Sequence, residues 1–576
     1  MLVQKLLKYL RGFEKECILG PLFKLLEASF ELMIPLVVAK IVDVGIASGD
    51  RGVIFRQCLI MIALGFVGLL SAVTAQWFAA KAAVGFATRL RHGVMEQLLS
   101  LSSSQMDRLG SSTMITRLTS DINQVQNGLN LTIRLLLRSP FVVFGAMIMA
   151  FTIDVRSALI FVGVIPLLSL VVFGIMLITM PMYKKVQGAL DGVTSATREN
   201  LNGVRVLRAF CQEKQQTDAF CQSTEGLTRQ QISAGRISAL LNPMTFVIIN
   251  LAVVLLVKTG AIQVEMGILS QGMVIALYNY MSQILVELIK LANLIITMTK
   301  AAACATRVSA ILRLQTDEST GTCREPISGH VEFRDVTGRY AGAAAPALEH
   351  ISFCAEPGQM IGIIGGTGCG KTTLVNLIPG LYEAAEGQVL IDGRPVQDYD
   401  LSCLRSQIGV VPQQARLFLG TIRSNLLWGN EQASEEELLQ ALELAQAREI
   451  IEGKPEGLDA PVEQDGVNLS GGQRQRLTIA RALVRKPRIL ILDDSASALD
   501  YATDSALRQA IRSLRNGPLT FLVSQRAASV RYADRILVLE DGHLAASGTH
   551  EQLLRESQVY QEIYYSQFPR EVSSHA

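Results

Sequence analysis

The distribution of apolar residues divides the chain into a membrane-like part and a soluble-like part. Two stretches, 57–80 and 157–183, contain no charged residue, and each is longer than the roughly 20 residues that a helix needs to cross a bilayer. Similar apolar runs lie at 17–41, 131–153, 240–257 and 271–298, although some of them contain charged residues. The pattern therefore predicts a helical membrane domain of six spans over residues 1–310.

The connections between these spans alternate between short and long. The long connections, 81–130 and 184–239, together with the flanking Arg134 and Arg138, hold fifteen lysines and arginines, against four in the short connections. Because positive charge is retained on the cytoplasmic side of a membrane, the long connections and both termini are predicted to be cytoplasmic. Apolar residues at helical spacing between 90 and 101 predict that the spans continue beyond the bilayer as helices.

The second part of the chain has a different pattern. Residues 311–328 are predicted to be a linker, and residues 329–576 alternate short β-rich runs with helical stretches. Several of these runs are apolar on both faces, as expected for strands of a buried parallel sheet. The predicted strands are 331–333, 360–364, 389–391, 408–411, 489–492 and 520–523. This part is therefore predicted to be an α/β domain.

Composition agrees with a membrane protein and excludes one class of partner. Hydrophobic residues make up 49% of the 576 residues, charged residues 18%, and the mean hydropathy of +0.32 is high for a soluble protein. The formal net charge is only +2, which argues against a surface for nucleic acid or another polyanion. The predicted spans exclude a soluble DNA-associated ATPase.

A glycine-rich loop follows the predicted strand 360–364 and precedes a predicted helix. Its sequence is Gly365-Gly366-Thr367-Gly368-Cys369-Gly370-Lys371-Thr372, which has the spacing of a phosphate-binding loop. Backbone N–H groups of such a loop surround phosphate oxygens at a helix N-terminus. We expect Lys371 to reach the β- and γ-phosphates of ATP and the Thr372 hydroxyl to bind Mg²⁺. Asp493, at the end of an apolar strand, suits the same metal.

Two further motifs follow the loop in order, so a chance glycine turn does not explain the set. They are Leu469-Ser470-Gly471-Gly472-Gln473 and, with Ser470 placed 23 residues before Asp493, Ile489-Leu490-Ile491-Leu492-Asp493-Asp494. With them, residues 330–566 resemble the nucleotide-binding domain of an ABC transporter, and the six spans resemble an ABC exporter half. The resemblance implies the ABC exporter fold, in which an α-helical six-span membrane domain precedes an α/β P-loop nucleotide-binding domain. It also implies ATP and Mg²⁺ as cofactors.

The resemblance assigns roles to individual positions. Tyr340 resembles the aromatic residue that stacks on adenine, and Gln413 resembles the glutamine that contacts Mg²⁺ and senses the membrane domain. Asp500, in Ser497-Ala498-Leu499-Asp500, resembles a loop that communicates between two nucleotide sites. The implied metal set is Thr372, Gln413 and Asp493. The implied nucleotide set is Tyr340, Gly365, Gly366, Thr367, Gly368, Cys369, Gly370, Lys371, Thr372, Thr373, Ser470, Gly471, Gly472, Gln473 and Asp500.

Two catalytic positions depart from the family pattern, which has glutamate at 494 and histidine at 525. Asp494 keeps the charge but retracts the carboxylate by about one methylene, and a misplacement of ~1 Å can cost ~10²-fold in rate. Gln525 forms hydrogen bonds but cannot carry the positive charge of a histidine. The catalytic set is therefore Asp494, Gln525 and Gln413 in a pocket that is expected to hydrolyse ATP slowly. The alternative is that both substitutes work tolerably.

The signature motif, Leu469–Gln473, is intact, and in this family it closes over the γ-phosphate of ATP held by the opposite subunit. A complete signature beside a degenerate pocket predicts a heterodimer with a second exporter half whose own site does most of the hydrolysis. The resemblance is to the bacterial heterodimeric multidrug type, embedded in the cytoplasmic membrane and exporting small amphipathic or hydrophobic substrates. The alternatives are a non-transporting regulatory subunit and a lipid or peptide exporter half.

Two weaker features complete the sequence analysis. Residues 107–121 and 209–218 occupy the places where exporters have coupling helices that dock on the nucleotide-binding domains, although ordinary solvated helix ends have a similar composition. Glu27 and Glu31 share one face of the first span, with Lys24 one turn earlier. Charged groups inside membranes face a cavity or a partner. A Lys24–Glu27 structural pair and a cavity lining or gate therefore both remain open.

Overall fold

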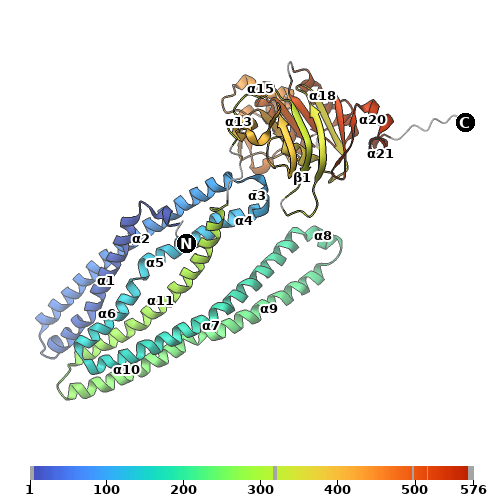
Figure 1. The fold of residues 1–576 in the computed structure, drawn as a ribbon. Coiled ribbons are helices and arrows are strands. Elements are labelled where there is room, and N and C mark those ends of the chain that lie inside the picture. The colour runs from blue at the N-terminus through green and yellow to red at the C-terminus, as the bar shows by residue number, and fades with distance from the viewer. Residues whose placement is uncertain (1–5, 315–320, 341, 496–498, 515–516, 569–576) are drawn as a thin grey trace. The chain divides into compact units, whose positions relative to one another are not determined.

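Long helices build the first part of the chain, and two β-sheets with surrounding helices build the second (Figure 1). The structure, a computed structural model, describes residues 6–314, 321–340, 342–495, 499–514 and 517–568. Two compact units divide the chain. One consists of Met1–Leu99 and Ser112–Leu314, and the other of Ser100–Ser111 and Gln315–Ala576.

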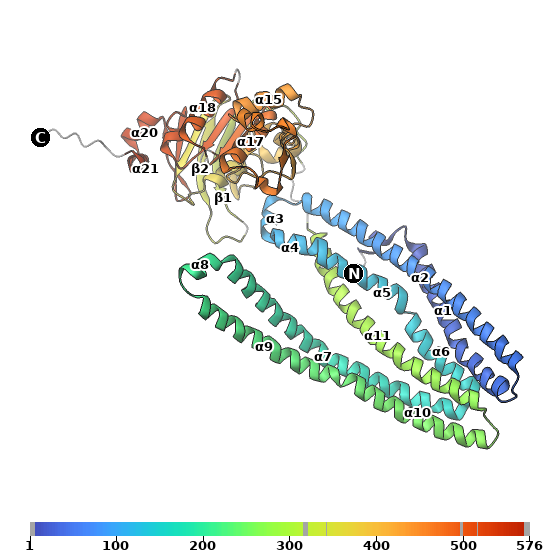
Figure 2. The same ribbon diagram turned by 180° about the vertical axis from the view of Figure 1, so that it is seen from behind.

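The first unit is helical throughout its described length. It begins with a short 3₁₀ helix at Leu6–Leu10, and π-helical turns at Ile41–Ile46 and Arg117–Asp121 interrupt the α-helices. The α-helices are α1 (Glu14–Lys40), α2 (Arg51–Leu99), α4 (Ser111–Thr116), α5 (Ile122–Leu135), α6 (Arg138–Ile153), α7 (Val155–Asn202), α8 (Val204–Ala209), α9 (Glu213–Ala239), α10 (Leu241–Glu265) and α11 (Gln271–Ile311). Figure 2 shows α7 running alongside α9 and α10, which follow one another end to end.

Within the described residues, five helical segments are long and apolar enough to cross a membrane. They are Arg51–Leu99, Ser111–Ile153, Val155–Asn202, Glu213–Glu265 and Gln271–Ile311. Helix α1, which covers the predicted span 17–41, is not among them. It contains Lys24, Glu27 and Glu31, which lower its apolar character. At 1.5 Å per residue, the 49-residue helix α2 is about 74 Å long, so it extends well beyond a hydrocarbon core of about 30 Å.

Small side chains allow the membrane helices to approach one another closely. On α2, Ala75, Ala79, Ala82 and Ala83 are buried, and a side chain at Gly20 of α1 would come within 2.9 Å of Ile133. Helices in lipid gain little from hydrophobic burial against one another, so close packing of small residues stabilises their association.

The second unit contains two main sheets. A parallel sheet has the order β12-β11-β3-β10-β9-β6, with only β12 antiparallel, and an antiparallel sheet has the order β2-β1-β4-β5. A two-stranded sheet pairs β7 with β8. The strands are β1 (Val331–Gly338), β2 (Leu348–Ala355), β3 (Met360–Gly365), β4 (Glu386–Ile391), β5 (Arg394–Pro395), β6 (Ile408–Val411), β7 (Gly420–Thr421), β8 (Pro461–Val462), β9 (Ile489–Asp493), β10 (Leu519–Val523), β11 (Arg535–Glu540) and β12 (His543–Gly548).

Alternate residues of the parallel strands pack into two different cores. In β9, Leu490 and Leu492 join a core formed with the helices, whereas Ile489 and Ile491 join a core formed with the antiparallel sheet. Because both faces are covered, β9 is apolar along its length. The helices of this unit are α3 (Ser103–Leu109), α12 (Lys371–Leu377), α13 (Leu401–Ser406), α14 (Ile422–Leu427), α15 (Glu435–Leu444), α16 (Arg448–Glu452), α17 (Gly471–Val484), α18 (Tyr501–Arg512), α19 (Ala527–Val530), α20 (His550–Glu556) and α21 (Gln558–Gln567).

All six predicted strands are present as β1, β3, β4, β6, β9 and β10. The sequence analysis did not anticipate that β1 and β4 leave the parallel sheet and pair antiparallel with each other. It also missed β2, β11 and β12, and the two-residue strands β5, β7 and β8. In β2 the buried and exposed residues alternate for part of its length, a pattern typical of an antiparallel strand with one covered face.

Candidate functional site

Four of the segments singled out by sequence meet at one edge of the parallel sheet. Strands β3, β10, β9 and β6 are neighbours in that order and run parallel. Because the carboxyl ends of parallel strands lie at the same edge, the segments that follow them emerge side by side. These segments are the glycine-rich loop after β3, Gln525 after β10, Asp494 after β9 and Gln413 after β6.

The glycine-rich loop closes around its own lysine. The Lys371 ammonium donates hydrogen bonds to the carbonyls of Gly365 at 2.9 Å and Gly366 at 2.6 Å, and it lies 3.6 Å from the buried sulfur of Cys369. Gly370 has a φ of +95°, and a side chain there would come within 2.5 Å of the Ala347 carbonyl. Only glycine meets both conditions at low cost.

The outer side of the loop is open, as a phosphate site requires. A Cβ added at Gly366 or Gly368 would meet no heavy atom within 4 Å, and Gly368 has a φ of +85°. Helix α12 begins at Lys371 directly after the loop, so its first N–H groups have no helical acceptors. The loop therefore fits an anionic group such as the triphosphate of a nucleotide.

Two adjacent carboxylates lie beside the loop. Asp493 is 5% exposed and accepts a hydrogen bond of 3.2 Å from the Thr372 hydroxyl, while the Gln413 side chain donates a hydrogen bond to Asp494. Burial raises the pKa of the Asp493 carboxyl above its ordinary value, and the charge of Asp494 raises it further. Burial also raises the pKa of Asp494, against the opposite effects of Gln413 and Lys371. Hydroxyl and carboxylate oxygens of this kind suit Mg²⁺.

The backbone at Asp494 adopts an uncommon conformation. Its φ is +47°, in the left-handed region, and its N–H donates to the Val523 carbonyl at 3.0 Å. Aspartate is among the few residue types other than glycine that are enriched in this conformation. Aspartate at position 494 therefore suits the left-handed backbone of the turn directly after β9.

Gln525 is exposed, and its backbone is held by a residue that the sequence analysis missed. The Gln567 side chain, from α21, donates to the Gln525 carbonyl at 2.8 Å and accepts from the Ala527 N–H at 2.8 Å. This double hydrogen bond ties the segment after β10 to a helix 42 residues later in the chain. No local sequence signal marks Gln567, because its role depends on tertiary packing.

Comparison with known proteins identifies ABC transporters in both parts of the chain. The ABC transporter transmembrane region family matches residues 17–288, and the ABC transporter family matches residues 348–497. The chain is 37% identical to the "Uncharacterized ABC transporter ATP-binding protein YfiB" of Bacillus subtilis, over 99% of this chain and 100% of that protein. The chain belongs to the ABC transporter family.

Other relatives of this ABC transporter cover most of its length. It is 34% identical to the "Uncharacterized ABC transporter ATP-binding protein Rv1273c" of Mycobacterium tuberculosis over 98% of both chains. It is 30% identical to the "ATP-dependent lipid A-core flippase" of Pseudomonas aeruginosa, over 89% of this chain and 85% of that protein. The family and these relatives support ATP binding and transport across a membrane.

The remaining sequence-predicted residues of this ABC transporter lie at helix starts and on the loop's flank. Ser470 and Gln473 form a reciprocal capping box at the start of α17, with hydrogen bonds of 3.3 Å and 3.0 Å, and Gly471 and Gly472 form its first turn. Asp500 caps α18 by accepting from the Thr503 N–H at 2.9 Å. Ser497 and Ala498 lie outside the described residues.

Tyr340 lies beside the glycine-rich loop. Its hydroxyl is 2.9 Å from the Thr373 hydroxyl, and its ring packs edge-on against Tyr382 at 5.2 Å. The Tyr382 hydroxyl in turn donates to Asp107 of α3 at 2.6 Å. Burial raises the pKa of Tyr382, as does the hydrogen bond to Asp107. A path of contacts therefore joins α3, a segment inserted in the sequence among the membrane helices, to the loop.

We expect Tyr382→Phe to weaken this path while keeping the ring against Tyr340. Stimulation of ATP hydrolysis by transport substrates should fall about fivefold, the equilibrium effect of one ~1 kcal/mol hydrogen bond. ATP affinity should stay unchanged. Hydrolysis with and without substrate, and equilibrium ATP binding, provide the measurement. Equal losses in both quantities would contradict a role in coupling.

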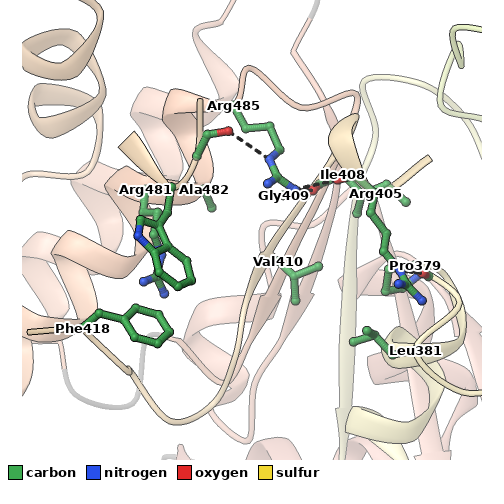
Figure 3. A pocket seen from close by; sticks show the side chains of 12 residues that line it. Pro379, Leu381, Arg405, Ile408, Gly409, Val410, Phe418, Arg481, Ala482 and Arg485 are labelled. Atoms are coloured by element: carbon green, nitrogen blue, oxygen red, sulfur yellow. Dashed lines mark hydrogen bonds between the residues drawn. The ribbon is translucent and has the colours of Figure 1, made fainter. Parts of the chain in front are cut away.

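A groove of about 320 Å³ lies elsewhere on the same unit (Figure 3). The rings of Phe418 and Trp428 stack at 3.9 Å on one side, and Arg481 and Arg485 line the groove. The Arg485 guanidinium donates to backbone carbonyls, whereas the buried Nη1 of Arg481 has no partner among the described residues. Burial, and then the charge of Arg485, lowers the pKa of Arg481. The groove therefore suits a segment that supplies hydrogen-bond acceptors.

The raised pKa of Asp493 predicts an effect on stability. Because the pKa of Asp493 in the folded protein lies above the ordinary 3.8, the protonated carboxyl is the form that the folded state favours. Its favourable contribution to the free energy of unfolding is present at low pH and is lost as the pH rises through the folded pKa. Asp493→Asn should therefore raise the melting temperature of the nucleotide-free protein at neutral pH by about 2 °C or more, the scale of ~1 kcal/mol. The gain should disappear near pH 3.8.

Asp500→Ala serves as the control of opposite sign. Asp500 caps α18, and hydrogen bonds from Thr503 lower the pKa of its carboxyl, so Asp500→Ala should lower the melting temperature at neutral pH. Thermal unfolding in detergent with a metal chelator measures both variants. A lower melting temperature for Asp493→Asn at neutral pH would mean that its hydrogen bond to Thr372 outweighs the cost of burial.

Proposed function

We propose that this chain is one half of a heterodimeric ABC exporter and holds ATP in a slow pocket while its partner's pocket does most of the hydrolysis. The observation that carries the proposal is the edge of the parallel sheet. There the lysine loop, Asp493 and Gln413 are grouped with a shortened carboxylate at Asp494 and an uncharged Gln525. The pocket has the groups that bind ATP and lacks the usual groups that hydrolyse it.

ATP binding follows from the residues around the loop. The triphosphate would occupy the open side of residues 365–372, where backbone N–H groups and Lys371 supply positive charge. Mg²⁺ would be held by Thr372 and Gln413, with Asp493 beside them, and would neutralise phosphate charge. Tyr340, which is 37% exposed, would present its ring to adenine. The signature residues Ser470–Gln473 would serve the nucleotide of the partner.

Slow hydrolysis follows from the two substitutions. The shorter side chain of Asp494 would withdraw its carboxylate from an attacking water, and a misplacement of about 1 Å can cost about 10²-fold in rate. Gln525 cannot place a positive charge near the γ-phosphate. An intact signature together with a slow pocket favours a partner subunit of different sequence. That partner would have a glutamate and a histidine at the positions equivalent to Asp494 and Gln525.

The membrane part completes the proposed exporter. We assign residues 1–310 to a six-span domain that includes α1, residues 311–328 to a linker, and residues 329–576 to the nucleotide-binding domain. The termini and the nucleotide-binding domain would lie in the cytoplasm, because lysine and arginine are concentrated in the long connections. Substrates would be small amphipathic or hydrophobic compounds, as in multidrug export.

Lipid export is a second candidate function. The relative of Pseudomonas aeruginosa, named as an ATP-dependent lipid A-core flippase, is similar to this chain over most of its length. A lipid is itself an amphipathic substrate, so the same membrane domain would serve. A non-transporting regulatory subunit is the alternative of a different class.

Transport and hydrolysis measured together test the proposal. The chain, alone and with the partner that copurifies from its native membrane, is reconstituted into vesicles with ATP outside. We expect ATP binding with little turnover for the chain alone, and substrate-stimulated hydrolysis with ATP-dependent uptake for the pair. Rapid hydrolysis by the chain alone would contradict the asymmetric site. Hydrolysis by the pair without any uptake would favour the regulatory alternative.

A further inference from the structure

A network of charged side chains lies within the membrane domain where α1, α6 and α11 pack together. Arg138 donates to Glu287 over 2.5 Å and to Glu31 over 2.6 Å. Glu287 also accepts from Ser139 at 2.9 Å and from Lys290 at 2.8 Å. The side chains of Arg138 and Glu287 are only 6% and 4% exposed. This central pair is buried and held by the hydrogen bonds above, although the buried Nε of Arg138 has no partner among the described residues, and Glu31 and Lys290 form the exposed ends of the network.

A cavity of about 390 Å³ lies beside the network and is lined by both exposed ends. The Glu31 side chain is 39% exposed and that of Lys290 is 42% exposed. Ile34, Val142 and Val286 supply an apolar wall. The cavity therefore combines a carboxylate, an ammonium and a hydrophobic surface.

The Glu31 end of the cavity has hydrogen-bond acceptors that lack donors. Within the described part of the chain, the Glu31 carboxylate bonds only to Arg138, and the buried Oε1 of Gln283 has no partner. Pro35, one turn after Glu31, also lines the cavity and has no N–H to give to the Glu31 carbonyl. The unsatisfied Oε1 of Gln283 is buried and therefore costly, and the partly exposed Glu31 carboxylate can accept further hydrogen bonds, so this end favours a ligand with several N–H donors, such as a protonated amine.

The Lys290 end requires the opposite kind of group. Its ammonium has three protons, and among the described residues only Glu287 accepts one of them. The formal charges of Glu31, Arg138, Glu287 and Lys290 sum to zero. A ligand with a net charge would leave that charge unbalanced inside the membrane, whereas a ligand with both charges would not.

We propose that this cavity is a binding site for the head group of a zwitterionic amphiphile, with its ammonium at Glu31 and Gln283 and its anionic group at Lys290. Glu31 and Lys290 line the same cavity and are linked through Arg138 and Glu287 by three hydrogen bonds of 2.5 to 2.8 Å, which favours a single head group in contact with both ends. The apolar chain of the ligand packs on Ile34 and Val142. This inference rests on the proposed exporter function and names its substrate class.

Three amphiphiles with the same twelve-carbon chain test the inference. They are dodecylammonium, dodecyl phosphate and dodecylphosphoethanolamine, added below their micelle concentrations to the intact exporter in nanodiscs. Binding is measured by displacement of radiolabelled dodecylphosphoethanolamine, and stimulated ATP hydrolysis is measured in parallel. The zwitterion should bind about tenfold more tightly than either of the compounds that carry charge of one sign only, the effect of one charge-assisted hydrogen bond.

Two single substitutions should move the preference in opposite directions. Glu31→Gln should weaken zwitterion binding about tenfold and favour dodecyl phosphate, whereas Lys290→Gln should weaken it similarly and favour dodecylammonium. Glu27→Gln is the matched control on the same helix. Glu27 pairs with Lys24 at 2.5 Å and does not line the cavity, so the order of the three ligands should not change.

The outcomes separate the site from the function. Unchanged preference in both variants, or an equal change in Glu27→Gln, would overturn the zwitterion site while leaving export intact. A loss confined to Glu31→Gln would overturn it in favour of a cationic ligand. Each variant is also tested for ATP binding and thermal unfolding, so that misfolding is recognised. If none of the three compounds binds and no substrate stimulates hydrolysis in an ATP-bound exporter, the proposed function fails as well.

Discussion

A heterodimer with Asp494→Gln in this chain should keep most of its ATP hydrolysis, whereas glutamine at the partner's equivalent glutamate should lower the rate about 10²-fold or more. The expected reason is that the shorter side chain of Asp494 withdraws its carboxylate from an attacking water. In the proposed heterodimer, the partner's glutamate would position water in the competent pocket. Steady-state rates at saturating ATP measure the difference.

Two further heterodimers extend this experiment. In the proposed heterodimer Ser470 would serve the partner's pocket, so its replacement by a bulky residue such as arginine should resemble loss of the partner's glutamate. Lys371→Ala should instead weaken ATP occupancy of this chain's site, because the ammonium both binds phosphate and holds the loop through Gly365 and Gly366. Equal losses from Asp494→Gln and from the partner's glutamate change would refute a division between a holding site and a working site.

Restoring the two missing groups should raise hydrolysis by the chain alone. Asp494→Glu with Gln525→His should increase turnover of the purified chain about 10- to 10²-fold, since carboxylate reach and a positive charge near the γ-phosphate are both recovered. Either change alone should give less, because the groups act on one transition state. The left-handed backbone at 494 limits the gain, since glutamate fits it less well than aspartate.

The matched control for this gain is Asp494→Glu with Gln525→Asn. It recovers carboxylate reach without the charge of the histidine, so its turnover should stay below that of the double restoration. The decisive readout is phosphate release by the chain without any partner, together with ATP affinity. If the restored chain binds ATP normally and remains as slow as the original, the two substitutions do not explain slow turnover.

Much of the nucleotide site could be predicted from local sequence. The loop from Gly365 to Thr372 has chemistry that depends on neighbouring residues in the chain, because the phosphate-binding groups are its own backbone and side chains. Apolar strands such as 489–492 are recognised because both faces of a parallel sheet are buried. The end of such a strand then places Asp493 at the sheet edge.

The antiparallel sheet was less predictable from the sequence. Strand β2 has a burial pattern that alternates only partly, and strand β1 pairs with β4 through irregular register. The pairing of β1 with β4 joins residues 49 to 60 positions apart, so no local pattern specifies it. Gln567 and Tyr382 escaped notice for the same reason, since their partners Gln525 and Asp107 lie 42 and 275 residues away.

Glu27 and Glu31 separate what the sequence determined from what the tertiary structure decided. Their spacing placed both carboxylates on one face of a helix. It could not decide between a structural ion pair and a cavity lining, because the helical repeat determines which way a side chain points but not what lies next to it. Glu27 found its partner three residues away in Lys24. The partner of Glu31 is Arg138, 107 residues away, and only the packing of α1 with α6 and α11 could bring it beside a cavity. The sequence therefore determines chemistry that involves neighbouring residues in the chain, whereas a site between helices is decided by how those helices pack in the tertiary structure.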